Sequence, residues 1–484
     1  MWGILYYRKG DAGGLMEIIE GAEFDSYWQP AAAGGEGPVY EAAREIIAAV
    51  RAEGDRALRR YAARFDKSSP LVPEVPAGLA AEAWDSLKAG EGELAGALEL
   101  AAEHIRRFAL EQRKQFADFE YSMGPGLVTG QKVIPVQRAA IYAPGGRFPL
   151  VSSVLMGLIP AFSAGVEEVI LASPPGPEGR PDRRVLAAAA LAGKLCGKAP
   201  RIFAIGGAQA IAALALGTET VPRADLIAGP GNKYVAAAKR LLSGEVGIDF
   251  VAGPTDVLII AEPEASAAEP EASAVEPGAP AAEPGAPAGT GMAAPPSAAD
   301  LAAADMLAQA EHDPDARARA LVPRIGEGGR LFAEEILKAL ERRLRDLPTR
   351  ENARASLDAG GLIVVYRDQA EAVRIANTIA PEHLELQIRE PESWIPLLKN
   401  YGSLFIGPLA AEALGDYSAG INHTRPTSGS ARFTGGLSVR HFLKTPTTLR
   451  CSRGEAFEAA RRAAFLIARA EGLAAHGESA GLRG

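Results

Sequence analysis

The sequence predicts an α/β protein in which helices cover parallel β-sheets. Two observations carry this prediction. Apolar, strand-like runs alternate with helical patterns through much of the chain, and short Gly-rich turns follow several of the runs, as after residues 139–143 and 226–228. Such strand–turn–helix repeats are typical of a parallel sheet with helices on both faces. Because ligands in such folds bind where the strands end, we expect a ligand near these turns.

The elements follow one another in a regular order. Apolar residues at helical spacing predict a helix over residues 38–65 and another over about 94–112. The predicted strands cover residues 139–143, 168–172, 201–204, 226–228, 257–260, 361–366 and 403–406. Five further helices are predicted over residues 152–164, 184–196, 300–312, 331–345 and 454–476. Three more are predicted to begin near Gly206, near Asn232 and at Asp368.

Residues 263–297 interrupt this pattern between a strand and a helix. The segment has no Lys, Arg or aromatic residue, and Glu-Pro-Gly-Ala-Pro begins at both Glu276 and Glu283. Such a composition buries no core, so we expect a disordered, solvated insertion, with a partner-binding segment as the alternative.

The bulk composition excludes several classes of function. The 484 residues carry a net charge of −9 without a Lys/Arg block, which argues against nucleic-acid binding. No apolar run reaches the length of a membrane span, and residues 1–7 do not read as a signal peptide. The 2 cysteines, Cys196 and Cys451, fit a reducing compartment. We therefore expect a cytoplasmic protein.

The histidines are scarce and placed beside other chemically useful residues. Of the 6 histidines, five follow residue 300. Side chains of these types can hold a metal and transfer protons, although each pair alone also fits a structural role such as a helix end, a turn or a frayed tail. The pairs are Gln309 with His312, Glu382 with His383, Asp416 with His423, and Glu471 with His476.

Three Gly-rich turns at strand ends favour a nucleotide or another anionic ligand. They are residues 144–146, 206–209 and 229–232. A full GxGxxG is absent, so a dinucleotide would be held differently from the usual fingerprint.

Taken in order, these segments resemble the histidinol dehydrogenase family from about residue 38 to 476, apart from the insertion. The motifs that carry the resemblance are IGGAQAIAALA from Ile205, GPGN from Gly229, AGPTDV from Ala252, QAEHDPD from Gln309, APEHLE from Ala380, GDY from Gly415, NH from Asn422, GLSV from Gly436 and EGLAAH from Glu471.

The resemblance implies oxidation of L-histidinol to L-histidine, through the aldehyde, with two NAD⁺ and one Zn²⁺. It implies Gln309, His312, Asp416 and His476 as zinc ligands. It implies His383 as acceptor of the alcohol proton and Glu382 as the base that activates water. The residues that match the family's substrate contacts are the four zinc ligands, His383, Thr255, His423 and Glu471. Those that match its NAD contacts are Tyr142, Gln209 and Asn232.

The resemblance also implies a homodimer in which the tail carries Glu471 and His476 into the partner's active site. The implied architecture is two incomplete Rossmann-like parallel-sheet domains: residues 38–140 with 254–437, and an NAD-binding domain over 141–253. An N-terminal arm (1–37) and a C-terminal dimerisation tail (438–484) flank them. The alternative is a related zinc and NAD dehydrogenase acting on another amino alcohol or a sulfonated diol. Thr255 replaces a common Ser, and Arg147 departs from the usual run of small residues.

Overall fold

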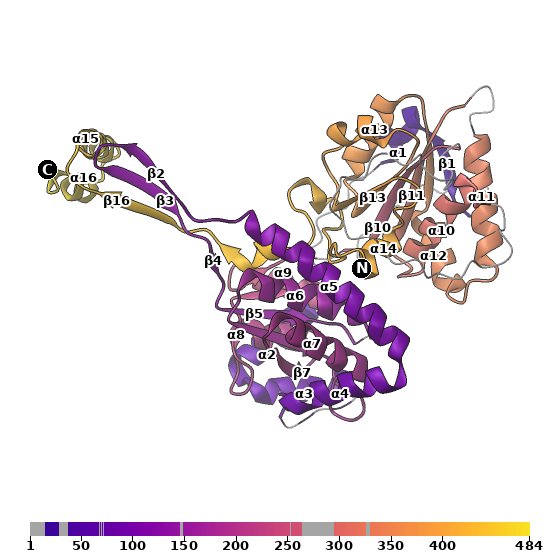
Figure 1. Cartoon of the computed structure of the whole chain (residues 1–484), viewed down its shortest axis with the longest axis horizontal. Helices are drawn as coiled ribbons and strands as arrows, with labels where there is room; N and C mark the ends of the chain where they lie inside the picture. The colour runs from indigo at the N-terminus through magenta and orange to yellow at the C-terminus, as the bar shows by residue number, and fades with distance from the viewer. Residues whose placement is uncertain are drawn as a thin grey trace, which may run out of the picture.

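The computed structural model describes residues 15–28, 37–145, 149–251, 253–263, 295–325 and 330–484, apart from residues 67, 69 and 71. These residues form two lobes, each built on a parallel sheet, and an arm that projects from one lobe (Figure 1). The insertion expected at residues 263–297 lies outside the described residues except at its ends, and so does Arg147. Among the described residues, no helix has the length and apolar character that a membrane crossing requires.

The first lobe contains a five-stranded sheet in the order β7-β6-β5-β8-β9, with every pair parallel. The chain runs from the central β5 to β6 and β7, then returns to β8 and β9 on the other side of β5. The strand order therefore reverses between β5 and β8, which is the place where ligands bind in such sheets. The strands are β5 (Arg138–Tyr142), β6 (Glu168–Ser173), β7 (Arg201–Ala204), β8 (Leu226–Ala228) and β9 (Gly247–Ile248).

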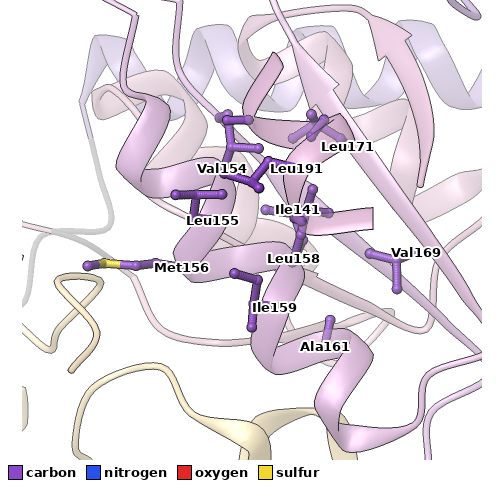
Figure 2. Close-up of a cluster of buried hydrophobic side chains, with 14 of the residues drawn as sticks. Ile141, Val154, Leu155, Met156, Leu158, Ile159, Ala161, Val169, Leu171 and Leu191 are labelled. Atoms are coloured by element: carbon purple, nitrogen blue, oxygen red, sulfur yellow. The ribbon is translucent and has the colours of Figure 1, made fainter. Parts of the chain in front are cut away.

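Helices cover both faces of this sheet. Successive strand residues point to opposite faces, so Ile141 enters one apolar core and Tyr142 the other. Figure 2 shows the first core, where Leu158 of α6 packs near Ile141 and Leu171. The helices of this core are α4 (Ala77–Gly90), α5 (Gly92–Lys114), α6 (Val151–Ala164) and α7 (Arg183–Cys196). Those of the second core are α2 (Pro38–Glu53), α3 (Asp55–Phe65), α8 (Gly207–Leu216) and α9 (Lys233–Leu242).

The packing of the N-terminal helices differs from the expected domain division. Residues 38–140 were expected to join residues 254–437, but helices α2 to α5 share cores with the five-stranded sheet. The single helix expected over residues 38–65 is two helices, because Gly54 adopts φ +54° between them. L side chains rarely adopt this backbone conformation, so glycine is favoured at the break.

The second lobe contains a six-stranded parallel sheet in the order β1-β12-β11-β10-β13-β14. Strand β1 comes from the segment expected to be an N-terminal arm, and it pairs with β12 at the sheet edge. The strands are β1 (Glu17–Glu20), β10 (Asp256–Ala261), β11 (Arg317–Pro323), β12 (Leu362–Tyr366), β13 (His383–Gln387) and β14 (Ser403–Ile406). Helices α10 (Ala298–Ala310), α11 (Leu331–Leu344) and α12 (Arg350–Gly360) cover one face, and α1 (Phe24–Tyr27) and α13 (Gln369–Ile379) cover the other.

The projecting arm joins two distant parts of the chain. Its antiparallel sheet has the order β16-β3-β2, and helices α15 and α16 lie at its far end (Figure 1). The expected helix over residues 454–476 is interrupted at Gly472, where φ is +77°. The elements are β2 (Phe119–Gly124), β3 (Leu127–Gln131), β16 (Thr447–Cys451), α15 (Glu455–Ala470) and α16 (Ala474–Gly481), with the short pair β4 (Ile134–Pro135) and β15 (Leu443–Lys444) at its base.

Candidate active site

The candidate active site begins where two neighbouring strands of the six-stranded sheet start. Strands β10 and β13 pair in parallel, with Val257 opposite His383. This register places Thr255 and Asp256 beside Glu382 and His383, at the amino ends of the strands. These residues therefore lie at the opposite end of their strands from the Gly-rich turns of the five-stranded sheet, near which a ligand was expected.

Glu382 is a buried residue whose carboxyl group and backbone form hydrogen bonds with Thr255 and Asp256. Its Oε2 lies 2.5 Å from the Thr255 hydroxyl and 3.3 Å from the Asp256 backbone nitrogen, both of which donate to it. Its own N–H donates to Asp256 Oδ1 at 3.1 Å, and Arg319 pairs with the other Asp256 oxygen at 3.1 Å. Burial raises the pKa of Glu382 to about 8, because water no longer stabilises the carboxylate. Glu382 can therefore gain and lose a proton near neutral pH.

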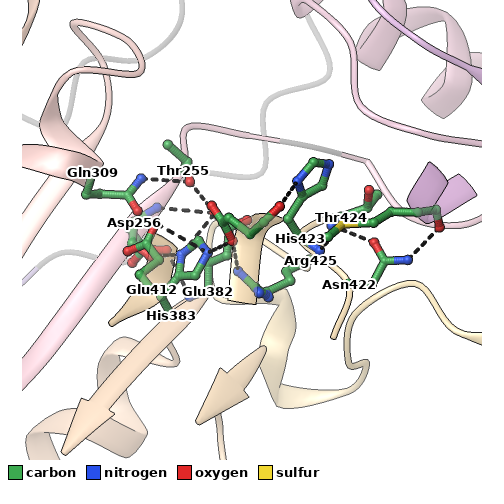
Figure 3. Close-up of polar contacts among 12 residues, drawn as sticks. Thr255, Asp256, Gln309, Glu382, His383, Glu412, Asn422, His423, Thr424 and Arg425 are labelled. Carbon is green, nitrogen blue, oxygen red and sulfur yellow. Dashed lines mark hydrogen bonds and ion pairs between the residues drawn. The ribbon is translucent and has the colours of Figure 1, made fainter. Parts of the chain in front are cut away.

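His383 presents one unprotonated ring nitrogen to the site. Its Nδ1 lies 3.1 Å from the Asp256 carbonyl oxygen, which only accepts, so Nδ1 carries the hydrogen. Nε2 has no hydrogen-bond partner among the described residues and faces Glu412 at 3.6 Å and Asp416 at 3.7 Å (Figure 3). Burial lowers the pKa of His383, so the ring stays neutral and can accept a proton.

A cluster suited to a metal ion lies beside His383. His312, Glu412 and Asp416 each offer one ligand atom, and these atoms lie within 4.8 Å of one another. Glu412 and Asp416 stand four residues apart on α14 (Glu412–Tyr417). The fully buried Gln309 amide lies 2.8 Å from the Thr255 hydroxyl on one side and 2.8 Å from the Glu412 carboxyl on the other. The structure thus brings together three of the four expected ligands and adds Glu412, which the sequence analysis missed although its helical spacing from Asp416 is a usable signal.

His476, the fourth expected ligand, does not reach this cluster within the chain. It is exposed on α16 at the far end of the projecting arm, and the neighbouring Glu471 is also exposed (Figure 1). Both residues therefore lie apart from the other expected site residues.

Arg425 is a further site residue that the sequence analysis missed. Its side chain is fully buried, and its Nη1 donates to Asp416 Oδ1 at 2.8 Å. Burial alone would raise the pKa of Asp416, but the charge of Arg425 holds it below its usual range. Burial, with the charges of Asp416 and Glu385, raises the pKa of Glu412 well above its usual range. The arginine charge therefore keeps one carboxylate of the cluster ionised.

His423 joins the two lobes at the site. Its Nδ1 lies 3.1 Å from the Asp416 carbonyl oxygen, and its Nε2 lies 2.9 Å from the Ser153 hydroxyl on α6. The neighbouring Asn422 donates to the Met156 carbonyl oxygen at 2.7 Å (Figure 3). Burial lowers the pKa of His423 to about 4, so it acts as a neutral hydrogen-bonding group.

A cavity of about 1310 Å³ lies along the carboxyl ends of the five-stranded sheet. Its lining includes Tyr142, Gln209 and Asn232, the three expected cofactor contacts. It is larger than a typical small-ligand pocket of roughly 300–1,000 Å³, as an extended ligand requires. The Tyr142 hydroxyl accepts a hydrogen bond from Gly207 at 3.0 Å, and burial raises its pKa to about 12. The Asn232 side chain accepts from Tyr234 and Val235 and so caps α9.

Comparisons with known proteins agree on one family. The family model described as histidinol dehydrogenase matches residues 33–274 and 292–484. Histidinol dehydrogenase from Thermus thermophilus is 45% identical over 445 residues, which cover 92% of this chain and 94% of the relative. That from Methylococcus capsulatus is 41% identical and covers 92% of each chain. A crystal structure of histidinol dehydrogenase from Elizabethkingia anophelis superposes with a TM-score of 0.81, 29% identity and 98% coverage of both chains.

Proposed function

Because the chain belongs to the histidinol dehydrogenase family, we propose that it oxidises L-histidinol to L-histidine with NAD⁺ at the site that contains Glu382 and His383. The observation that supports this site most directly is the neutral, unpartnered Nε2 of His383 next to the His312–Glu412–Asp416 cluster. It combines a buried proton acceptor with three metal-binding side chains, of which Glu412 and Asp416 are buried and His312 is exposed.

We propose that His312, Asp416 and Gln309 hold a zinc ion, with the Glu412 carboxyl group beside them. The donor chemistry fits, since imidazole nitrogen and carboxylate oxygen are common zinc ligands, and an amide oxygen is an unusual but possible one. When bound, zinc supplies a Lewis-acidic template for the imidazole and amine of the substrate. Arg425 supports the site by keeping Asp416 ionised.

His383 and Glu382 take the two proton-handling roles. His383 Nε2 accepts the proton of the substrate alcohol, since Nδ1 is already committed to the Asp256 carbonyl. Glu382 removes a proton from the water that attacks in the second oxidation, and a pKa near the working pH suits a general base. Thr255 orients the Glu382 carboxyl, and His423 and Thr255 line the substrate position.

The NAD site is proposed at the cavity of the five-stranded lobe. Tyr142, Gln209 and Asn232 line it together, and its position at the β5–β8 reversal supports a dinucleotide there. These residues would hold NAD⁺, which would supply the hydride acceptor for each of the two oxidations.

A second subunit is proposed to complete the site. Its tail would deliver His476 as the fourth zinc ligand and Glu471 as a substrate contact, as family resemblance implies. Two features support this assignment. Both residues are exposed at the end of the projecting arm, and the arm leaves several large apolar side chains exposed, which suits burial against another copy. These side chains include Phe119, Tyr121, Met123, Leu449, Leu466 and Ile467. A cytoplasmic location is part of the same proposal.

The decisive experiment measures NADH formation from L-histidinol with quantification of L-histidine. We expect about two NADH per histidine, loss of turnover with a chelator and recovery with Zn²⁺. A chelator-treated sample given Mg²⁺ instead of Zn²⁺ is the control. Turnover of another amino alcohol or a sulfonated diol, without turnover of histidinol, would contradict the proposal.

A further inference from the structure

A buried ion pair in the five-stranded lobe contacts the loop that carries Asn232. Lys239 of α9 and Asp249, which follows β9, have side chains 2% and 0% exposed, and Lys239 Nζ lies 2.5 Å from Asp249 Oδ1. Among the described residues, the hydrogen bonds of these two side chains go to Gly229 and Phe250, neither of which is assigned above to the site.

The pair binds both the backbone N–H and the backbone carbonyl oxygen of Gly229. Lys239 Nζ donates to the Gly229 carbonyl oxygen at 2.9 Å, and the Gly229 N–H donates to Asp249 Oδ2 at 2.8 Å. Gly229 begins the loop that ends at Asn232. Its φ is +113°, and a Cβ there would stand 2.2 Å from the Tyr142 carbonyl oxygen. The pair therefore fixes the loop directly against the end of β5, next to a second expected cofactor contact.

Asp249 also fixes the segment that crosses between the lobes. Its Oδ1 accepts from the Phe250 N–H at 2.7 Å, and the Lys239 ammonium lies 5.4 Å from the centre of the Phe250 ring. The chain then runs toward Gly253, whose N–H donates to Thr427 at 2.6 Å, and reaches Thr255 at the Glu382 carboxyl. The ion pair thus links the Gly229–Asn232 loop to the segment that leads into β10, next to Glu382.

Stability alone is a weak reason for such a pair. Removing two charges from water is costly, and replacing a buried pair by apolar residues of similar volume is often neutral or stabilising. Because this pair binds both the N–H and the C=O of Gly229, its more specific effect is to fix the position of the loop.

We propose that Lys239 and Asp249 are positioning residues, which hold the Gly229–Asn232 loop and the inter-lobe crossing so that NAD⁺ bound in the cavity faces the catalytic carboxyl and imidazole. The inference rests on the proposed function. It assigns to these residues no contact with substrate or cofactor.

The test compares Lys239→Met, Asp249→Asn and the double variant Lys239→Met/Asp249→Leu with the unaltered holoenzyme. The melting temperature, the KM for NAD⁺, the KM for histidinol, kcat and the affinity for NADH by fluorescence titration are measured. We expect all three variants to raise the KM for NAD⁺ by about tenfold or more, since misplacement of about 1 Å is costly, with the KM for histidinol nearly unchanged. The double variant should recover melting temperature but not the KM for NAD⁺.

The control is Lys88→Met/Glu99→Leu, which removes an exposed pair on the same lobe, with side chains 48% and 45% exposed. We expect its constants to stay within about twofold, because such pairs contribute little. In the double variant, a return of both the KM for NAD⁺ and the melting temperature to the values of the unaltered protein would show that the pair has only a structural role. That result would overturn the proposal. If the unaltered protein fails to oxidise histidinol, the proposed function fails, while the NADH titration still decides whether the pair positions the loop.

Discussion

The two lobes share one architecture but use opposite edges of their sheets. The five-stranded lobe opens its cavity at the carboxyl ends of its strands, next to Tyr142. The six-stranded lobe places Glu382 and His383 at the amino ends of β10 and β13. Parallel topology therefore does not decide by itself at which end of the strands a cavity or a group of buried ionisable residues lies.

The lobes also differ in what they bury. Among the described residues, the fully or nearly buried charged side chains of the five-stranded lobe are Asp55, Lys239 and Asp249. The six-stranded lobe buries many more: Asp256, Arg319, Glu371, Glu382, Glu385, Glu412, Asp416 and Arg425. Buried charges are costly unless they are paired, so their concentration marks the lobe in which chemistry takes precedence over packing.

The largest expected effect comes from removing both proposed proton acceptors of the six-stranded lobe. In Glu382→Gln/His383→Asn we expect kcat to fall by about 10³-fold or more, because each general base contributes about 10²–10⁴-fold. Zinc content and melting temperature should stay close to those of the unaltered protein. Steady-state kinetics and metal analysis check this, with Glu99→Gln as the surface control. Persistent turnover would show that other groups move the protons.

A smaller but still large effect is expected from Arg425→Met. The change leaves Asp416 buried without its cationic partner, and breaking a buried pair costs about 3–5 kcal/mol. Urea unfolding of the metal-free protein measures the loss. Lys88→Met, which breaks an exposed pair in the other lobe, should change the free energy of unfolding by less than about 1 kcal/mol. Equal losses in the two variants would contradict the contrast drawn between the lobes.

The smallest effect concerns a carboxyl group in the cavity of the five-stranded lobe. Burial raises the pKa of Asp66 from its ordinary 3.8 to about 6, so the folded protein binds this proton more tightly than the unfolded chain does. Stability should therefore fall as the pH rises from about 4 to 6, and Asp66→Asn should remove about 1 kcal/mol of that fall, after allowance for partial exposure.

Thermal unfolding of Asp66→Asn at pH 4, 5 and 7 tests this expectation. Glu82→Gln, which alters another carboxyl group lining the same cavity, serves as the comparison. A pH profile of Asp66→Asn that is parallel to that of the unaltered protein would show that Asp66 is solvated.

The sequence analysis succeeded where apolar patterning and motifs agree with the fold. Two parallel sheets with helices were predicted, and residues 139–143 lie close to the observed β5. Strands β11 and β13 were missed because they carry buried charges, such as Arg319 and Glu385, that break an apolar run. Strand β1 was missed because it has only four residues at a sheet edge.

The composition of the site was only partly predictable, for a related reason. Motifs identified Glu382 and His383, but Arg425 lies in an ordinary-looking loop segment, and only the tertiary fold brings its guanidinium to Asp416. The division implied by the resemblance joined residues 38–140 to residues 254–437, whereas the apolar faces of helices α2 to α5 pack in the cores of the five-stranded lobe. Patterning shows that such a face is buried and does not show against which partner.

The bonds of His423 and Asn422 to Ser153 and Met156 have a consequence for the order of events during turnover. Swinging the lobes apart would break both bonds. If the proposed oxidation reduces two NAD⁺ in succession, either these two hydrogen bonds break between the two steps, or NADH leaves through the cavity while the intermediate stays bound between the lobes.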